Sequence, residues 1–121
     1  MNTIDKPAPQ MSVVDHGVED GIAWVTCRAP LWGAINGYVR VPDDHPWHGL
    51  DYDAEGMDPA VNGGLTFAKG DWIGFDTLHA GDWWPESSGP HFHDDYCTHW
   101  TPEMVAEETR KLARQVAEAG R

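Results

Sequence analysis

Hydrophobic and polar residues alternate over short stretches in the central part of the chain and follow a helical period near its end. Residues 22–28 (IAWVTCR) are rich in β-branched and aromatic side chains and follow a glycine, which predicts a strand. Residues 36–42 (NGYVRVP) alternate Tyr38 and Arg40 with two valines and predict a second strand that ends at Pro42. The segment between them contains a proline and a glycine and predicts a loop.

Two further strands are predicted after a long polar loop. Residues 63–68 (GGLTFA) and 71–77 (DWIGFDT) flank Lys69-Gly70, where a tight turn would join them into a hairpin. The pattern leaves open whether the odd-numbered or the even-numbered side chains of the second strand face the core. Residues 43–60, before the hairpin, predict little regular structure, and loops of this length in compact domains are usually functional or mobile.

The clearest predicted element is a helix near the end of the chain. Thr101 is a natural N-cap, Pro102 suits the first helical position, and Glu103 lies where the helix dipole favours a carboxylate. Glu107 and Lys111 are four residues apart, so an ion pair is expected on the outer face. Apolar side chains recur at helical spacing up to Gly120, at Val105, Leu112, Ala113, Val116, Ala117 and Ala119.

These elements predict an α+β fold: a small, mainly antiparallel sheet of about four strands with one long C-terminal amphipathic helix packed on a face. A chain of 121 residues suits one domain with a modest core. Residues 1–20 are expected to form a flexible N-terminal arm and residues 21–121 the domain, because the first ten residues hold two prolines and no apolar period. The exposed edge of so small a sheet is compatible with a homodimer.

Composition excludes some partners. Twenty acidic against eight basic residues give a formal net charge of −12, whereas a nucleic-acid-binding surface needs a basic patch. Acidity of this size either keeps a protein soluble or mimics a polyanion toward a basic partner. Two cysteines outside any CxxC pair, with no signal pattern and no membrane-length apolar run, predict a cytoplasmic protein with reduced thiols, no membrane partner and no cofactor.

The segment GFDTLHAGDWW, residues 74–84, concentrates candidate chemistry. Asp76, His79 and Asp82 are spaced by three residues, so they would converge if the chain turned helically after the strand. Such a set could bind Zn, Mn or Fe, or could make His79 a general base oriented by a carboxylate. Equally, these residues could be the polar groups of a turn that shapes a pocket.

Other histidines offer weaker candidates. His45 and His48 are flanked by aspartates in the polar loop and could ligate a cation, although Pro46 weakens any helical geometry there. The tract PHFHDDYCTH, residues 90–99, is dense in donors but matches no closed zinc spacing, so no structural metal is expected in it.

Tryptophans and glycines suggest a different kind of site. Indoles at loops and strand ends can stack on flat ligands such as nucleobases, or can simply fill the core of a small sheet. Backbone N–H groups at Gly63 and Gly64 could approach a phosphate. The indoles in such positions are Trp32, Trp47, Trp72, Trp83, Trp84 and Trp100.

The ordered segments resemble a family of small proteins of tailed phages and prophages, many from actinobacterial hosts. NGYVRVPDDHPWHGLDYD, VNGGLTFA, WIGFDTLHAGD and the final helix are similar to the family's GYV-x-V-P-x-x-HP, HGGLT, WWIGFD-x-AHAGD and C-terminal helix segments. The resemblance covers residues 36–117 and implies a shared fold and a viral origin, without a known reaction. The matching positions are Tyr38, Pro42, His45, Pro46, Gly49, Gly63, Gly64, Thr66, Trp72, Gly74, Asp76, His79, Gly81 and Asp82.

Two positions depart from the family pattern. Asn62 stands where the family usually has His, and Asn36 stands where it often has Cys. An amide replaces a hydrogen-bonding His better than a metal-ligating one, because it can both donate and accept.

The leading functional hypothesis is a phage accessory protein that binds a small, nucleotide-derived ligand and could sequester a host defence signal. One alternative is a metal-dependent or His-based hydrolase, with His79 as the catalytic candidate and Asp76 and Asp82 as its partners. A second alternative is an acidic protein–protein interaction or mimic module. The predicted ligand-binding residues are His45, Asn62, Gly63, Gly64, Thr66, Trp72, Asp76, His79, Gly81 and Asp82.

Overall fold

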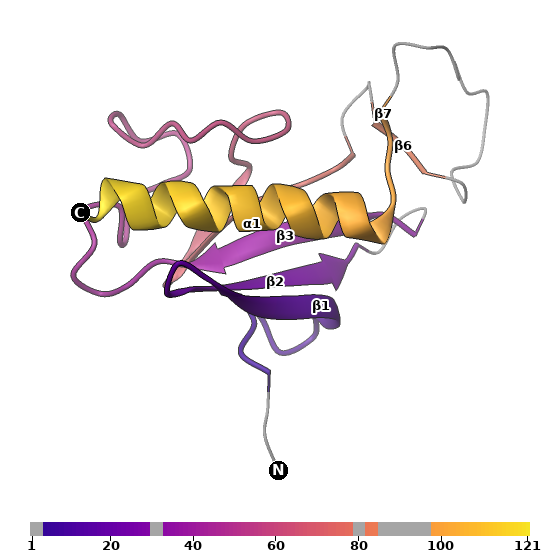
Figure 1. Ribbon diagram of the computed structural model, residues 1–121, viewed down its shortest axis with the longest axis horizontal. Helices are drawn as coiled ribbons and strands as arrows, with labels where there is room; N and C mark the ends of the chain where they lie inside the picture. Colours follow the sequence, from indigo (N-terminus) through magenta and orange to yellow (C-terminus); the bar gives the residue numbers. More distant parts are fainter. Residues whose placement is uncertain (1–3, 30–32, 79–81, 85–97) are drawn as a thin grey trace.

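The computed structural model describes residues 4–29, 33–78, 82–84 and 98–121 and has the predicted α+β architecture. An antiparallel sheet of five strands, in the order β1-β2-β3-β5-β4, carries helix α1 (Pro102–Ala119) across one face (Figure 1). Two short strands, β6 (Asp82–Trp83) and β7 (Thr98–His99), form a separate parallel pair. The strands of the main sheet are β1 (Ser12–Glu19), β2 (Ile22–Arg28), β3 (Ile35–Arg40), β4 (Phe67–Lys69) and β5 (Trp72–Phe75).

Strand β1 lies in the segment that the sequence assigns to a flexible arm. Glu19 pairs with Ile22, so Asp20 and Gly21 form a two-residue turn in which both φ angles are positive, 51° and 81°. Asp-Gly is typical of this hairpin turn, so the sequence does contain the signal. The register shifts between Val13 and Asp15, and this bulge obscures the period of the strand. The arm is therefore confined to residues before Ser12.

The predicted β4–β5 hairpin is present, with its turn one residue later than expected. Lys69 pairs with Trp72, so the turn residues are Gly70 and Asp71. Strand β4 begins at Phe67 rather than at residue 63. The reason is that the two glycines at 63 and 64 have φ angles of 69° and 79°, which no strand residue adopts.

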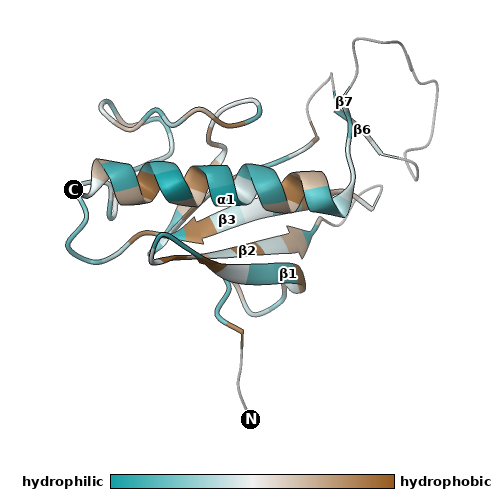
Figure 2. Ribbon diagram, in the orientation of Figure 1, coloured by the Kyte–Doolittle hydropathy of each residue, from teal (hydrophilic) through white to brown (hydrophobic). Residues whose placement is uncertain are grey.

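Helix α1 has the predicted N-terminal cap and an apolar face. The Thr101 side-chain oxygen accepts the Met104 N–H at 3.2 Å. Apolar and polar positions alternate along the helix (Figure 2), and its buried side chains include Val105, Leu112 and Val116. This face contacts β1, β2 and β3. Among the residues that the structure describes, no helix combines the length and apolarity needed to cross a membrane.

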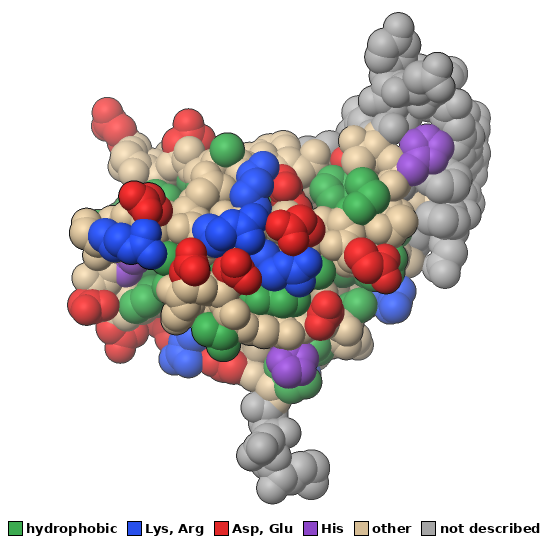
Figure 3. Space-filling view, viewed as in Figure 1, with side chains coloured by type: hydrophobic (Ala, Val, Ile, Leu, Met, Phe, Trp, Pro, Cys, Tyr) green, Lys and Arg blue, Asp and Glu red, His purple; other side chains and the backbone are tan. Residues whose placement is uncertain are grey.

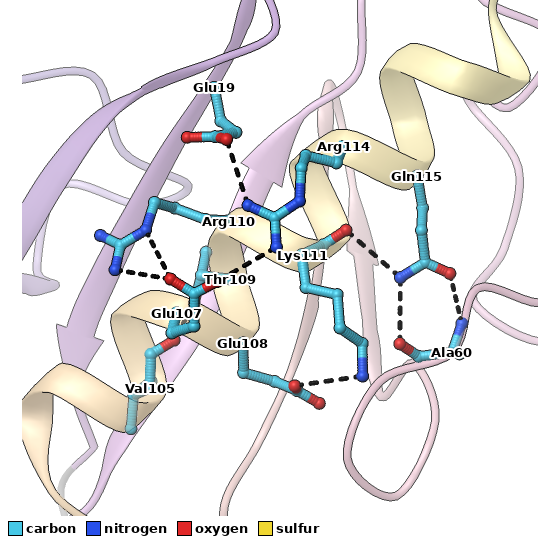
Figure 4. Close-up of polar contacts among 10 residues, drawn as sticks. All are labelled: Glu19, Ala60, Val105, Glu107, Glu108, Thr109, Arg110, Lys111, Arg114 and Gln115. Carbon is cyan, nitrogen blue, oxygen red and sulfur yellow. Dashed lines mark hydrogen bonds and ion pairs between the residues drawn. The ribbon is translucent and has the colours of Figure 1, made fainter.

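Acidic and basic side chains on the solvent-exposed side of α1 form ion pairs with each other. Lys111 pairs with Glu108 at 3.3 Å rather than with Glu107, which was the expected partner. Glu107 instead accepts from Arg110 and Arg114, at 2.9 and 3.1 Å (Figure 4). These pairs use i,i+3 and i,i+7 spacing. Acidic and basic side chains are interleaved along the helix (Figure 3), so this face is not uniformly acidic.

The sheet separates two apolar clusters. Alternation along β2 sends Trp24 toward the helix and Cys27 toward the opposite face, which we call the outer face. On β5, Ile73 and Phe75 face the helix and Trp72 faces outward, which settles the face that the sequence left open. The outer cluster consists of Val25, Cys27, Tyr38 and Trp72, with Met11, Val13 and Phe67 packed against it.

The N-terminal arm and the long loop between β3 and β4 are both tied to the domain. In the arm, Asp5 pairs with Arg40 of β3 at 2.7 Å. In the loop, the backbone N–H and C=O of Ala60 bond to the Gln115 side chain of α1, at 2.7 and 3.0 Å (Figure 4). Met57 is buried in the helix-side core. The loop has little regular structure, as predicted, yet it packs against the helix.

Candidate functional site

A cavity of about 440 Å³ lies on the outer face of the sheet, between the residues that precede and begin β1 and the neighbouring parts of β2 and β3. Strand alternation places the contributing side chains: Cys27 points outward from β2, and Tyr38 points outward from β3. Met11 packs against the same outer cluster. The lining includes Met11, Ser12, Cys27, Arg28, Asn36 and Tyr38.

Asn36 is held in place by hydrogen bonds within the domain. Its side-chain oxygen accepts the Thr77 N–H at 3.1 Å, which fixes the amide at the beginning of β3. The Asn36 amide also lies close enough to the Tyr38 hydroxyl to lower its pKa. Thr77 is itself buried and donates its hydroxyl to the Ile35 C=O at 2.8 Å. The polar wall of the cavity is therefore preorganised by the sheet.

Burial controls the acidity of the cavity's ionisable groups. It raises the pKa of the Cys27 thiol to about 11, although the charge of Lys6 opposes the change. Burial also raises the pKa of the Tyr38 hydroxyl. The neighbouring Asn36 side chain lowers this pKa, whereas the charges of Cys27 and Asp76 raise it further. Both groups are thus neutral at pH 7, and Cys27 is not an activated nucleophile.

The raised pKa of Cys27 predicts low thiol reactivity. At pH 8 we expect iodoacetamide to modify Cys27 about 100-fold more slowly in the folded protein than after unfolding, because a pKa of about 11 instead of 9.0 leaves far less thiolate. Mass spectrometry of the Cys27 peptide measures both rates. Folding favours the protonated thiol, so its stabilising contribution is complete below about pH 9 and is lost between pH 9 and 11. Equal rates at pH 8 in the two states would contradict the burial of this thiol.

Two of the predicted site residues lie near this cavity. Trp72 belongs to the outer cluster with Cys27 and Tyr38, and its indole is buried there. Asp76 follows β5, and its Oδ1 accepts the Leu78 N–H at 3.0 Å. The Asp76 charge also acts on the Tyr38 pKa, so its carboxylate lies within electrostatic range of the cavity wall.

A second group of predicted residues lies beside the N-terminal half of α1. Asn62 Nδ2 donates to both carboxylate oxygens of Asp82, at 3.2 Å each. Trp100 Nε1 donates to Asp82 Oδ1 at 2.7 Å, and Glu108 accepts the Asn62 N–H at 2.8 Å. Asn62 thus takes part in hydrogen bonding, the role that its amide predicted.

Gly63, Gly64 and Thr66 follow Asn62 and build a turn and the start of a hairpin. The Gly64 N–H donates to the Val61 C=O at 3.0 Å, and the Thr66 N–H donates to the Gly74 C=O at 3.0 Å. The first bond uses the Gly64 N–H, one of the two glycine N–H groups that were expected to approach a phosphate.

His45 lies at the opposite end of the helix, where it is structural. Its Nδ1 accepts the Trp47 N–H at 2.9 Å, so Nε2 carries the proton of the neutral ring and donates to the Val116 C=O at 2.7 Å. The ring is buried and meets the Trp47 indole edge-on, with centroids 5.3 Å apart. Both ring nitrogens are therefore engaged inside the domain.

The predicted residues that the structure describes lie in several places. His79 and Gly81 lie outside the described residues, as do Trp32, the side chain of Trp83 and residues 90–97 of the His-rich tract. Of the predicted DxxHxxD set, Asp76 accepts the Leu78 N–H and Asp82 accepts from Asn62, and the position of His79 between them lies outside the described residues. The indoles of Trp72, Trp84 and Trp100 are buried in the apolar clusters, which favours the core-filling alternative for them.

The sequence did not single out Cys27, Arg28 and Asn36 as site residues. Strand alternation could have placed Cys27 with Val25 on one face, and Asn36 with Tyr38. It could not have shown that the residues before β1 leave a cavity over them.

Comparisons with models of known protein families, with curated proteins and with solved structures find no match for this chain. The candidate site therefore rests on the chemistry and geometry of the chain itself.

Proposed function

We propose that the protein binds a small, nucleotide-derived anion in the cavity on the outer face of the sheet. The observation that carries this proposal is the cavity of about 440 Å³, whose lining combines apolar surface with a few convergent polar groups. Ligand pockets for small molecules typically have volumes of about 300–1,000 Å³ and this kind of lining.

The lining offers complementary groups for each part of such a ligand. Met11 and the Tyr38 ring provide apolar surface against which a flat base can pack. The Tyr38 hydroxyl and the Asn36 amide provide hydrogen-bonding groups. Arg28 also borders the cavity at the end of β2, and a guanidinium can bind phosphate oxygens in a bidentate manner. A cation at this position favours an anion in a protein whose net charge is −12.

The chemistry of the cavity supports binding rather than turnover. Its thiol is protonated at neutral pH, and its phenol also has a raised pKa. Neither group is poised as a nucleophile or a base. Retention of an unchanged ligand is what sequestration of a nucleotide signal requires.

The test is thermal stabilisation by adenosine and guanosine monophosphates and their cyclic forms, combined with mass spectrometry of small molecules released when the purified protein is denatured. A ligand at 100 times its Kd would stabilise the fold by about 2.7 kcal/mol. Arg28→Ala is expected to weaken binding about tenfold, because it removes one charge-assisted contact to the anion.

Lys69→Ala is the matched control, because it removes one cation from another strand end of the same sheet, outside the cavity. It should bind as the wild type does. The proposal is wrong if no nucleotide stabilises the wild type and no small molecule is released. An equal loss of nucleotide affinity in Arg28→Ala and Lys69→Ala would show only a general effect of removing a positive charge.

A further inference from the structure

A separate polar cluster lies beyond the C-terminal end of β3 and contains Asp43, His48 and Asp71. His48 Nε2 is 2.8 Å from Asp71 Oδ1 and 3.3 Å from Asp43 Oδ1. One donor atom from each of the three residues lies within 4.8 Å of the other two. The cavity described above borders Asn36, which lies four residues before Arg40, the last residue of β3. The cavity and this cluster are therefore distinct.

Backbone hydrogen bonds hold the three residues together. The Val41 N–H donates to the Asp71 C=O at 2.6 Å, which joins the β4–β5 turn to the end of β3. The loop then turns twice: the His45 N–H donates to the Pro42 C=O and the His48 N–H donates to the His45 C=O, each at 3.0 Å. The cluster is therefore assembled from two segments that the fold fixes relative to each other.

Arg40 orients the Asp71 carboxylate by binding the oxygen that does not contact His48. Its Nη2 donates to Asp71 Oδ2 at 3.1 Å, which leaves Oδ1 directed at His48. The His48 hydrogen bond, and after it the Arg40 hydrogen bond, lower the Asp71 pKa, so this group is a carboxylate at neutral pH. Arg40 also pairs with Asp5 at 2.7 Å. Asp5, Asp43 and Asp71 thus place three carboxylates around the single Arg40 guanidinium.

We propose that Asp43, His48 and Asp71 bind a divalent first-row transition-metal ion, with Zn²⁺ the best match. Bonds of 2.0–2.1 Å in a tetrahedral site place neighbouring donor atoms about 3.3 Å apart, close to the 2.8 and 3.3 Å that separate Nε2 from the two carboxylates. The ion takes the place of the Nε2 proton. Arg40 holds the ligating carboxylate by the outer hydrogen bond that such ligands commonly have.

The donor set also selects among cations. One imidazole with two carboxylates suits Zn²⁺ or Mn²⁺, whereas Ca²⁺ takes six to eight oxygen ligands and Mg²⁺ prefers oxygen in an octahedral shell. Three protein ligands leave the fourth position of a tetrahedral Zn²⁺ open to water or to an anionic ligand. This inference is independent of the proposed nucleotide binding.

The test is titration of the metal-free full-length protein with Zn²⁺ by calorimetry and with Co²⁺ by visible absorption. Wild type is expected to bind one equivalent more than His48→Ala, and Asp71→Asn is expected to weaken that site at least about tenfold. His16→Ala and Asp44→Asn are the matched controls, since they remove an exposed histidine and an exposed aspartate outside the cluster. Both should bind as the wild type does. Mg²⁺ and Ca²⁺ at the same concentrations should leave the site empty.

Equal stoichiometry and affinity in wild type and His48→Ala would overturn the proposal, because the remaining histidines would then account for all binding. Circular dichroism checks that each variant is folded. If Asp71→Asn unfolds, Asp43→Asn replaces it, because the Asp43 side chain is 90% exposed and its substitution is expected to leave the fold intact. Unchanged affinity in that variant would likewise exclude the three-ligand site.

Discussion

Gly37→Ala is expected to lower the free energy of unfolding by about 3 kcal/mol, the upper part of the usual cost of overpacking. A Cβ atom on this residue of β3 would overlap Thr109 Oγ1 of the helix and lie 2.6 Å from Phe75 Cε1. Gly37 thus lies where the helix packs closely on the sheet, and neither neighbour can move freely because both are fully buried. Thermal denaturation followed by circular dichroism should show a melting temperature lower by roughly 12 °C.

A double-mutant cycle with Thr109→Ala separates this clash from other effects. Thr109 Oγ1 donates to the Val105 C=O at 2.6 Å within the helix (Figure 4), so its loss alone should cost little. The double variant should regain part of the stability lost in Gly37→Ala, while the contact with Phe75 remains. Additive effects of the two substitutions would contradict the proposed contact.

His45→Ala is expected to lower the free energy of unfolding by about 2–3 kcal/mol while leaving nucleotide binding intact. The substitution removes a buried ring and both of its hydrogen bonds, to the Trp47 N–H and to the Val116 C=O. It thereby detaches the loop after β3 from the last turn of α1. Chemical denaturation measures the loss, and the slope of the transition should stay unchanged.

His16→Ala is the control, because His16 is an exposed histidine of β1, where substitutions usually change stability by less than about 0.5 kcal/mol. A His45→Ala variant with unchanged stability but lost ligand binding would instead restore the ligand-binding role that the sequence suggested for His45.

Much of the fold was predictable because its strongest signals are local. The pattern of residues 22–28 matches β2 at both ends, and Thr101-Pro102 marks the start of α1. The capping hydrogen bond and the apolar helical period act within a few residues, so the sequence displays them directly. Strand β1 was missed because its bulge interrupts the alternation on which the strand prediction relies.

The proposed metal-binding cluster was much less predictable than the fold, because it depends on contacts between distant segments. Asp43 and Asp71 are far apart in sequence and meet through the backbone bond between Val41 and Asp71. His45 and His48 look alike in the sequence, yet one ring is buried against the helix and the other remains partly exposed beside two carboxylates. Residue type alone cannot distinguish them.

The sequence by itself determined the α+β class, the helix with its cap, the β4–β5 hairpin and the acidity of the protein, because these depend on local pattern and on composition. Only the tertiary structure decided which face of each strand the helix covers, and that Cys27 and Tyr38 border a cavity on the other face. It also decided which histidine is structural. The physical reason is that burial and hydrogen-bond partners are set by segments far away along the chain, and these determine which polar groups remain available for a ligand.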